Sequence, residues 1–210
     1  MNSINEIDIL KNFNDLTKPD PRSLAFLNSI EERHTVLSSI ALKETVPAEV
    51  KQLFETAKNL SLYSWFVYRF HQASEMIAFS AAELALKIRF NLENPNSKSR
   101  ITFSELINHA INNHWVAKEN FPRLHQRAIN LAEQTKAIEA AAFLDQTNTN
   151  ECVIENPTEE EVYNTLEGLD LNFLLSIPKI RNDLAHGSKT LSPSSASTLR
   201  LLSEFINQIY

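Results

Sequence analysis

The sequence predicts an all-α fold, and its use of glycine and proline is the main reason. Only two glycines, Gly168 and Gly187, occur in 210 residues, whereas the tight hairpins of β-sheet proteins depend on glycine. With 43% apolar residues, the chain can bury a substantial core as one domain. Prolines fall at apparent boundaries, where they lie outside a helix or in its first turn: Pro19, Pro21, Pro47, Pro95, Pro122, Pro157 and Pro193.

Apolar residues at helical spacing locate the helices of the N-terminal half. They predict one helix from about Ile4 to Leu16, a second from about Ser23 to Lys43 and a third after Pro47. The stretch from Leu62 to Leu92 is apolar around most of its circumference. Such a helix is usually central in a bundle or shared with a partner.

Capping signals locate the helices of the C-terminal half. The residues from Thr102 to Glu105 have the spacing of a capping box and should open a helix that runs to about His114. Pro122 should start another helix through about Leu144, and the residues from Thr158 to Glu161 repeat the capping pattern before a short helix. The polar segment from Gln146 to Pro157 is the expected loop.

The net charge of −6 is unevenly distributed along the chain. Eight acids and no Lys or Arg lie between Asp145 and Asp170, and the remainder carries a charge of +2. We interpret this acidic insertion as a solvated loop and short helix; a segment that masks a phosphate site is the alternative. A mildly basic body is compatible with RNA binding.

Cysteine use and hydropathy indicate a soluble cytoplasmic protein. The single Cys152 excludes an intramolecular disulfide and a cysteine-based zinc site, which fits a reducing compartment. No run approaches the roughly 18 apolar residues of a membrane span, and the first six residues are not a basic leader. We therefore expect an unprocessed chain with no membrane partner.

The residues from Arg181 to His186, with Gly187 after them, are the most informative motif. At about 100° per residue, Asn182 and His186 fall opposite the expected core face, and Arg181 lies on its flank. Gly187 is a natural left-handed cap, so His186 should end the helix, while Pro178 marks either a kink or a restart. The expected core face of this helix consists of Phe173, Ile177, Ile180 and Leu184.

These residue types suit reactions at a phosphate. Arg181 offers a planar, charged fork that matches phosphate oxygens, and His186 can exchange a proton near neutral pH. Asn182 could orient the imidazole or donate to phosphate. In RNA the 2′-hydroxyl is a built-in nucleophile, so one proton acceptor and one phosphate clamp suffice without metal. A symmetric dimer packed through this face would bring two such sets into one cleft.

Glu83 is a second candidate, because it lies in the apolar stretch from Leu62 to Leu92. An unpaired carboxylate there would be costly. Its partner is either Lys87, four residues on in the favourable order, or an arginine elsewhere in the chain, which would be a functional tether.

On these residues the chain resembles a HEPN domain, whose ribonuclease members share an Arg, a polar residue, a short spacer and a His. The stretch from Tyr68 to Phe90, including Ser80 to Lys87, resembles the family's long second core helix, and Pro193 to Tyr210 resembles its closing helix. The resemblance covers residues 60–210, interrupted by the acidic insertion at about 145–170. Residues 1–59 are expected to form an N-terminal helical extension packed on the bundle.

The resemblance implies a dimer with a metal-independent endoribonuclease site at its interface, acting as a toxin or phage-defence effector on RNA, with an antitoxin or sensor as a possible partner. The resemblance implies that Arg181, His186 and Asn182 are the catalytic residues and that the reaction needs no cofactor or metal. The alternative is a non-catalytic HEPN module that dimerises or binds RNA or nucleotides. We name supporting residues Glu83 and Asp183, and RNA-binding residues Lys179 and Lys189.

Other chemistries have weaker sequence support. A nucleotide-hydrolysing site would need a glycine-rich phosphate loop. The sequence offers no complete ligand set for the metal of a hydrolase. His109 and His114 are expected to point to different faces of their helix, and the helical pair His71 and Glu75 lacks a third ligand. If the motif has only a structural role, Arg181 would make surface ion pairs and His186 would cap the end of its helix.

Overall fold

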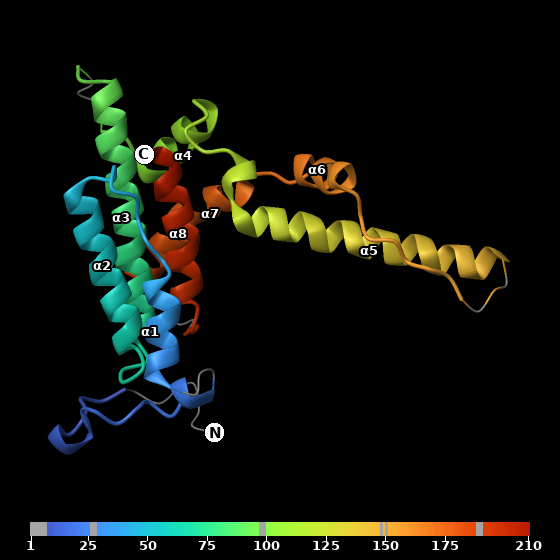
Figure 1. The fold of residues 1–210 in the computed structure, drawn as a ribbon. Helices are drawn as coiled ribbons and strands as arrows, with labels where there is room; N and C mark the ends of the chain where they lie inside the picture. Colours follow the sequence, from blue (N-terminus) through green and yellow to red (C-terminus); the bar gives the residue numbers. More distant parts are fainter. Residues whose placement is uncertain (1–7, 26–28, 97–99, 148, 150, 188–190) are drawn as a thin grey trace.

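The computed structural model describes residues 8–25, 29–96, 100–147, 149, 151–187 and 191–210, and its regular structure in these ranges is helical throughout (Figure 1). Short 3-10 helices lie at Phe13–Asp15, Ser23–Ala25 and Lys118–Asn120. The α-helices are α1 (Ile30–Ser38), α2 (Ala48–Tyr63), α3 (Phe70–Glu93), α4 (Phe103–Asn112), α5 (Pro122–Thr147), α6 (Glu159–Glu167), α7 (Asn172–Ala185) and α8 (Ser195–Ile209). The predicted all-α fold is confirmed.

Helix α3 is the centre of the bundle, and it packs against α2, α4, α7 and α8. Its buried face is rich in alanine, and the side chains of Ala78, Ala82 and Ala85 are fully buried, so neighbouring helices can approach closely. The central helix predicted from Leu62 to Leu92 is divided in the structure. Helix α2 ends at Tyr63, a turn follows, and α3 begins at Phe70.

The hydrophobic core is continuous from α2 to α8. Its largest fully buried side chains come from six different segments, and burial of each side chain contributes about 1.5–3 kcal/mol. Among them are Phe54, Leu86, Leu106, Phe121, Leu174, Leu199 and Phe205. Residue 59, the expected end of the N-terminal extension, lies within α2. The division of the chain into 1–59 and 60–210 stays a prediction.

The first two helices differ from those predicted. Of the stretch from Ile4 to Leu16, residues 8–16 are described, and they contain only the 3-10 turn. Ile9, Leu10 and Phe13 are more than 80% exposed, and a short amphipathic helix that packs on nothing is unstable in water. In the described residues of the stretch from Ser23 to Lys43, the α-helix is α1, and a 3-10 turn lies at Ser23–Ala25. The N-terminus of α1 is capped by Ser29, whose side chain accepts the Glu32 backbone N–H.

The capping signals of the C-terminal half are confirmed. Both predicted capping boxes are present, at the starts of α4 and α6. Helix α4 ends at Asn112, two residues earlier than predicted, because His114 has a left-handed backbone (φ 55°). The N–H of Trp115 bonds the Ala110 carbonyl and that of His114 bonds the Ile111 carbonyl, a Schellman ending without glycine.

Helix α5 leaves the bundle and, together with α6 and the segment between them, forms a projecting arm (Figure 1). We define the arm as residues 122–170. The 26 residues of α5 span about 39 Å. Its buried side chains, Leu124, Ala128 and Ala132, all lie in the half nearest the bundle, and α6 packs along it.

None of the helices in the described ranges is both long and apolar enough to cross a membrane.

Candidate functional site

Helix α7 carries the Arg181–His186 motif and packs against α3 and α4. Its fully buried side chains are Leu174 and Ile177, and Leu184 packs at the edge of the core. Ile180, predicted in the core, is 44% exposed. The inner face keeps Ile177 and Leu184 but is rotated by about 50°, so that it follows the spacing 174, 177, 181 and 184 and brings Arg181 to the edge of the core. The helix continues through Pro178 and therefore does not restart there.

Arg181 is held by Glu83, which projects from α3. The guanidinium Nη2 lies 3.0 Å from Glu83 Oε2, and Lys87 Nζ lies 2.6 Å from Glu83 Oε1. The two partners considered for Glu83 are therefore both present, one on each carboxylate oxygen. The Glu83 side chain is 14% exposed and that of Arg181 is 35% exposed. The ion pair lies at the boundary between core and solvent.

Asn182 contacts Arg181 and is exposed. Its Oδ1 accepts a hydrogen bond from Arg181 Nη1 at 3.1 Å. The sequence suggested that Asn182 orients His186 or donates to phosphate, whereas in this structure its side chain helps to orient the guanidinium. Two of the Arg181 nitrogens are therefore fixed by neighbours on α3 and α7, which limits the rotamers of a long side chain.

His186 ends α7 as predicted. It is the C-cap residue, its N–H bonds the Asn182 carbonyl at 2.9 Å, and Gly187 follows with φ +86°. The His186 side chain is exposed, as are those of Asp183 and Lys179. Lys189 lies outside the described residues. Arg181 and Asn182 are therefore joined by a hydrogen bond and tied to α3 through Glu83, and His186 lies exposed at the end of the same helix.

A buried polar cluster around His71 was not predicted from the sequence. Its members are Arg33 from α1, Ser61 from α2, Ser64 after α2, His71 from α3 and Ser195 from α8, and each is at least nine-tenths buried. The donors are separated from their acceptors by up to 134 residues in sequence, so no local spacing could reveal the cluster.

Hydrogen-bond directions in the cluster fix the His71 tautomer. Ser64 Oγ donates to the Ser61 carbonyl at 2.8 Å, so it accepts from His71 Nε2 at 3.1 Å. His71 Nδ1 is then the acceptor of the Ser195 hydroxyl at 2.7 Å. Burial, and after it the positive charge of Arg33, lower the pKa of His71 from 6.5 to about 3. His71 is therefore a neutral structural residue.

Glu75, the expected partner of His71 in a metal pair, is bound elsewhere. Its Oε1 accepts hydrogen bonds from Ser194 Oγ at 2.7 Å and from Thr198 Oγ1 at 3.0 Å, which tie α3 to the start of α8. Burial raises the pKa of Glu75. Within the described part of the chain, no group of three or more His, Cys, Asp or Glu side chains could hold a metal ion.

The acidic insertion makes its ion pairs away from Arg181. Glu167 pairs with Lys118 and Glu161 with Lys136, whereas Arg181 pairs with Glu83. These contacts fit the interpretation of residues 145–170 as a solvated loop and short helix better than that of a segment masking the motif.

Comparison of the chain with protein-family models, with curated proteins and with solved structures finds no match. The likeness to HEPN domains therefore depends on the motif and on the helices that surround it.

Proposed function

We propose that this protein is a metal-independent endoribonuclease of the HEPN type, with a composite site where two copies meet through α7. Arg181 binds the scissile phosphate and stabilises the extra negative charge of the pentacovalent transition state. His186 accepts the proton of the neighbouring 2′-hydroxyl, whose oxygen attacks phosphorus. The bond to the 5′-oxygen breaks and that oxygen takes up a proton, which leaves a 2′,3′-cyclic phosphate and a 5′-hydroxyl.

The tether between Glu83 and Arg181 is the observation that carries this proposal. A long arginine side chain at an open surface normally samples many rotamers. Here a largely buried carboxylate and Asn182 Oδ1 each hold one guanidinium nitrogen, with exposed His186 five residues further along the chain. Such pre-organisation is what a phosphate clamp requires, because the charge must already be in place when the transition state forms.

The outer face of α7 supports packing of two copies. Leu175 is 39% exposed, and at about 100° per residue it lies on the same face of α7 as Asn182 and His186. A symmetric contact through this face would cover Leu175 and align two sets of Arg181 and His186 across one cleft. Lys179, exposed on the same helix, would add a phosphate contact.

In the cell, we propose that such a nuclease acts as a toxin or phage-defence effector in the cytoplasm, restrained by an antitoxin or a sensor. Expression of the wild-type chain should then arrest growth. Arg181→Ala and His186→Ala should each relieve the arrest at equal protein level. Persistence of the arrest in both variants would contradict the catalytic roles.

One observation favours a second candidate, a non-catalytic module that dimerises or binds RNA or nucleotides. Glu83 offsets the charge of Arg181, and Glu83 and Asn182 already occupy two of its nitrogens. A binding module would retain RNA affinity without cleavage in any metal condition.

Purified protein incubated with structured and single-stranded RNA in EDTA separates the two candidates. We expect cleavage by the wild type, loss of cleavage in His186→Ala and retained cleavage in His34→Ala, which removes an exposed histidine of α1. Absence of cleavage by a folded dimer, or equal cleavage by the His186→Ala variant, would contradict the proposal.

A further inference from the structure

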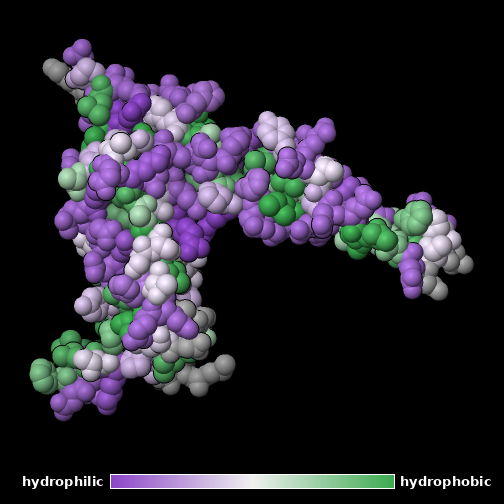
Figure 2. Space-filling view, in the orientation of Figure 1, coloured by the Kyte–Doolittle hydropathy of each residue, from purple (hydrophilic) through white to green (hydrophobic). Residues whose placement is uncertain are grey.

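The arm is the most acidic part of the molecule, and it buries few of its side chains. Residues 122–170 contain ten Asp or Glu and three Lys or Arg, whereas the rest of the chain carries a net charge of +1. Several apolar side chains of the arm face solvent. Ile138, Phe143 and Ile154 are 53–62% exposed, and Val153 is 89% exposed. Figure 2 shows apolar side chains gathered near α6 and again towards the outer end of the arm.

Two surface hollows lie along α5. The one nearer the bundle, of about 650 Å³, lies between α5 and α6 over Ile129, Val162 and Leu166. The other, of about 370 Å³, lies towards the tip between α5 and the returning chain, over Phe143 and Ile154. Each hollow therefore has an apolar floor formed by α5 on one side and by later residues of the arm on the other.

Both hollows open along one stripe of α5. The residues of α5 that line them recur every three or four positions, so they share one face of the helix. From first to last this stripe spans 18 residue steps, or about 27 Å. The two hollows have no lining residue in common, but they lie one after the other along this stripe, and we call the hollows and the stripe together the groove. The stripe consists of His125, Ile129, Glu133, Lys136, Ala140 and Phe143.

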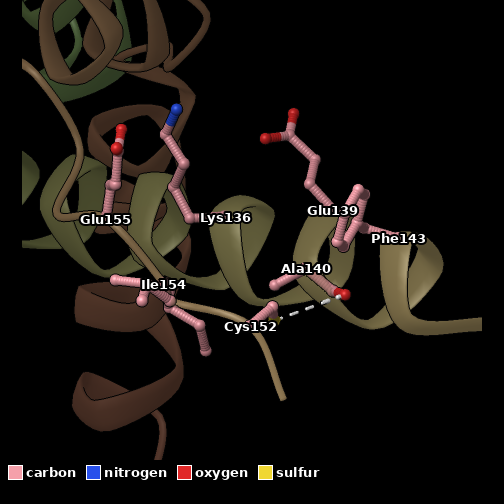
Figure 3. A pocket seen from close by; sticks show the side chains of 8 residues that line it. Lys136, Glu139, Ala140, Phe143, Cys152, Ile154 and Glu155 are labelled. Atoms are coloured by element: carbon pink, nitrogen blue, oxygen red, sulfur yellow. Dashed lines mark hydrogen bonds between the residues drawn. The ribbon is translucent and has the colours of Figure 1, made fainter. Parts of the chain in front are cut away.

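Carboxylates surround the apolar floor. Glu133 and Glu159 line the inner hollow, and Glu139 and Glu155 line the outer one. In Figure 3 the charged ends of Lys136, Glu139 and Glu155 point to the same side of α5. Lys136, the one Lys or Arg that lines the hollows, is paired with Glu161, so its charge is compensated and the rim is negative.

We infer that this groove is the docking site for a basic amphipathic helix of another protein. The apolar floor fits residues spaced at i, i+3, i+4 and i+7 on one face of such a helix, and its length matches about five turns. Lys and Arg beside that face would meet the carboxylates of the rim. The negative rim would repel RNA and an identical arm, and the rest of this chain carries a net charge of only +1, so a more basic partner fits the rim better than a second copy does. This inference is independent of the proposed nuclease activity.

A pair of synthetic 18-residue peptides tests the inference on the full-length protein. One peptide combines a leucine face with lysine elsewhere, and the other has glutamate in place of lysine. Fluorescence anisotropy at 0.05 M salt should show binding of the lysine peptide only. Adding salt to 0.3 M should weaken that binding, because the charges on the rim are exposed to screening.

Matched variants separate docking from general charge attraction. Glu133→Lys combined with Glu159→Lys, and separately Phe143→Ser, should each raise the Kd for the lysine peptide at least about tenfold. Glu31→Lys combined with Glu55→Lys changes the net charge equally on exposed residues of α1 and α2 and should change the Kd less than about threefold. Phe143 is exposed at the tip, so its loss spares the fold.

The inference is overturned if the wild type does not bind the lysine peptide or if the groove variants and the α1/α2 control weaken it equally. It is also overturned if the wild type forms a dimer in light scattering that Phe143→Ser dissociates, because the groove would then hold a second copy.

Discussion

The bundle and the arm differ in how far they bury their side chains. In the bundle, α3 is surrounded by four helices, and even the polar groups of the His71 cluster have partners from α1, α2 and α8. In the arm, α5 buries three small or aliphatic side chains near its base, and Ile138 and Phe143 farther out are exposed. The bundle therefore supplies most of the stability of the fold, whereas the arm and the outer face of α7 leave apolar side chains exposed.

Two phenylalanines give the sharpest contrast. Phe205 of α8 is fully buried, and Phe143 of α5 is 53% exposed. Phe205→Ala should lower the free energy of unfolding by about 3–5 kcal/mol, because it removes transfer energy and leaves a cavity. Phe143→Ala should lower it by less than about 1 kcal/mol. Urea denaturation measures both, and comparable losses would mean that the arm is part of the cooperative core.

The His71 cluster should make the bundle sensitive to acid. Because burial and Arg33 lower the pKa of folded His71 from 6.5 to about 3, the unfolded chain binds a proton there that the folded protein does not. The free energy of unfolding should be unaffected by this group above pH 6.5 and should fall by about 1.4 kcal/mol per pH unit between pH 6.5 and about pH 3. Denaturation at pH 7.5 and pH 5.0 measures the slope.

An exposed histidine provides the control for this slope. His34→Gln should leave the pH dependence unchanged, since His34 is exposed on α1. His71→Gln should abolish that component of the slope, whatever its effect on stability at pH 7.5. An unchanged slope in His71→Gln would show that another group accounts for the acid sensitivity.

The tether between Glu83 and Arg181 should matter for activity more than for stability. If the proposed nuclease site is correct, Glu83→Gln should lower kcat about 10- to 100-fold with little change in KM, since Arg181 loses the charge that positions it. Lys87→Met removes the other partner of Glu83 and should change kcat less than about threefold. Equal losses in the two variants would mean that Glu83 does not act through Arg181.

Loss of either capping box should have the smallest effect on stability. The two losses should again distinguish the bundle from the arm. Thr102→Ala at the start of α4 should lower the free energy of unfolding by about 1 kcal/mol. Thr158→Ala at the start of α6 should instead increase amide hydrogen exchange within α6 and leave the global value within about 0.5 kcal/mol. A global loss at Thr158 equal to that at Thr102 would mean that the arm unfolds with the bundle.

Local signals in the sequence were sufficient for the fold class, for both capping boxes and for the end of α7 at His186. These features depend on residues a few positions apart, such as Thr158 and Glu161. Features that depend on tertiary contacts were wrong or missed. Over residues 8–16, the described part of the first predicted helix, the apolar side chains are exposed rather than packed on the bundle. Ile180 faces outward because α3 and α4 contact the adjacent stripe of α7. The His71 cluster joins residues up to 134 positions apart.

For the candidate site, the sequence identified Glu83 and Arg181 as separate residues with a possible link. It could not decide between Lys87 and an arginine as the partner of Glu83, because helical spacing specifies a neighbour on the same helix and says nothing of a partner 98 residues away. In the structure, one carboxylate oxygen of Glu83 binds Lys87 and the other binds Arg181.

Cleavage of an RNA that carries a single 2′-deoxynucleotide tests the central claim most directly. Once the cleaved bond is mapped with all-ribose RNA in EDTA, the 2′-hydroxyl beside that bond is removed and the reaction is repeated with the wild type and with His186→Ala. The account predicts that the wild type cleaves the all-ribose RNA, leaving a 2′,3′-cyclic phosphate, and leaves that bond intact in the substituted RNA. Cleavage of the substituted RNA at the same bond, or cleavage by the His186→Ala variant, would contradict it.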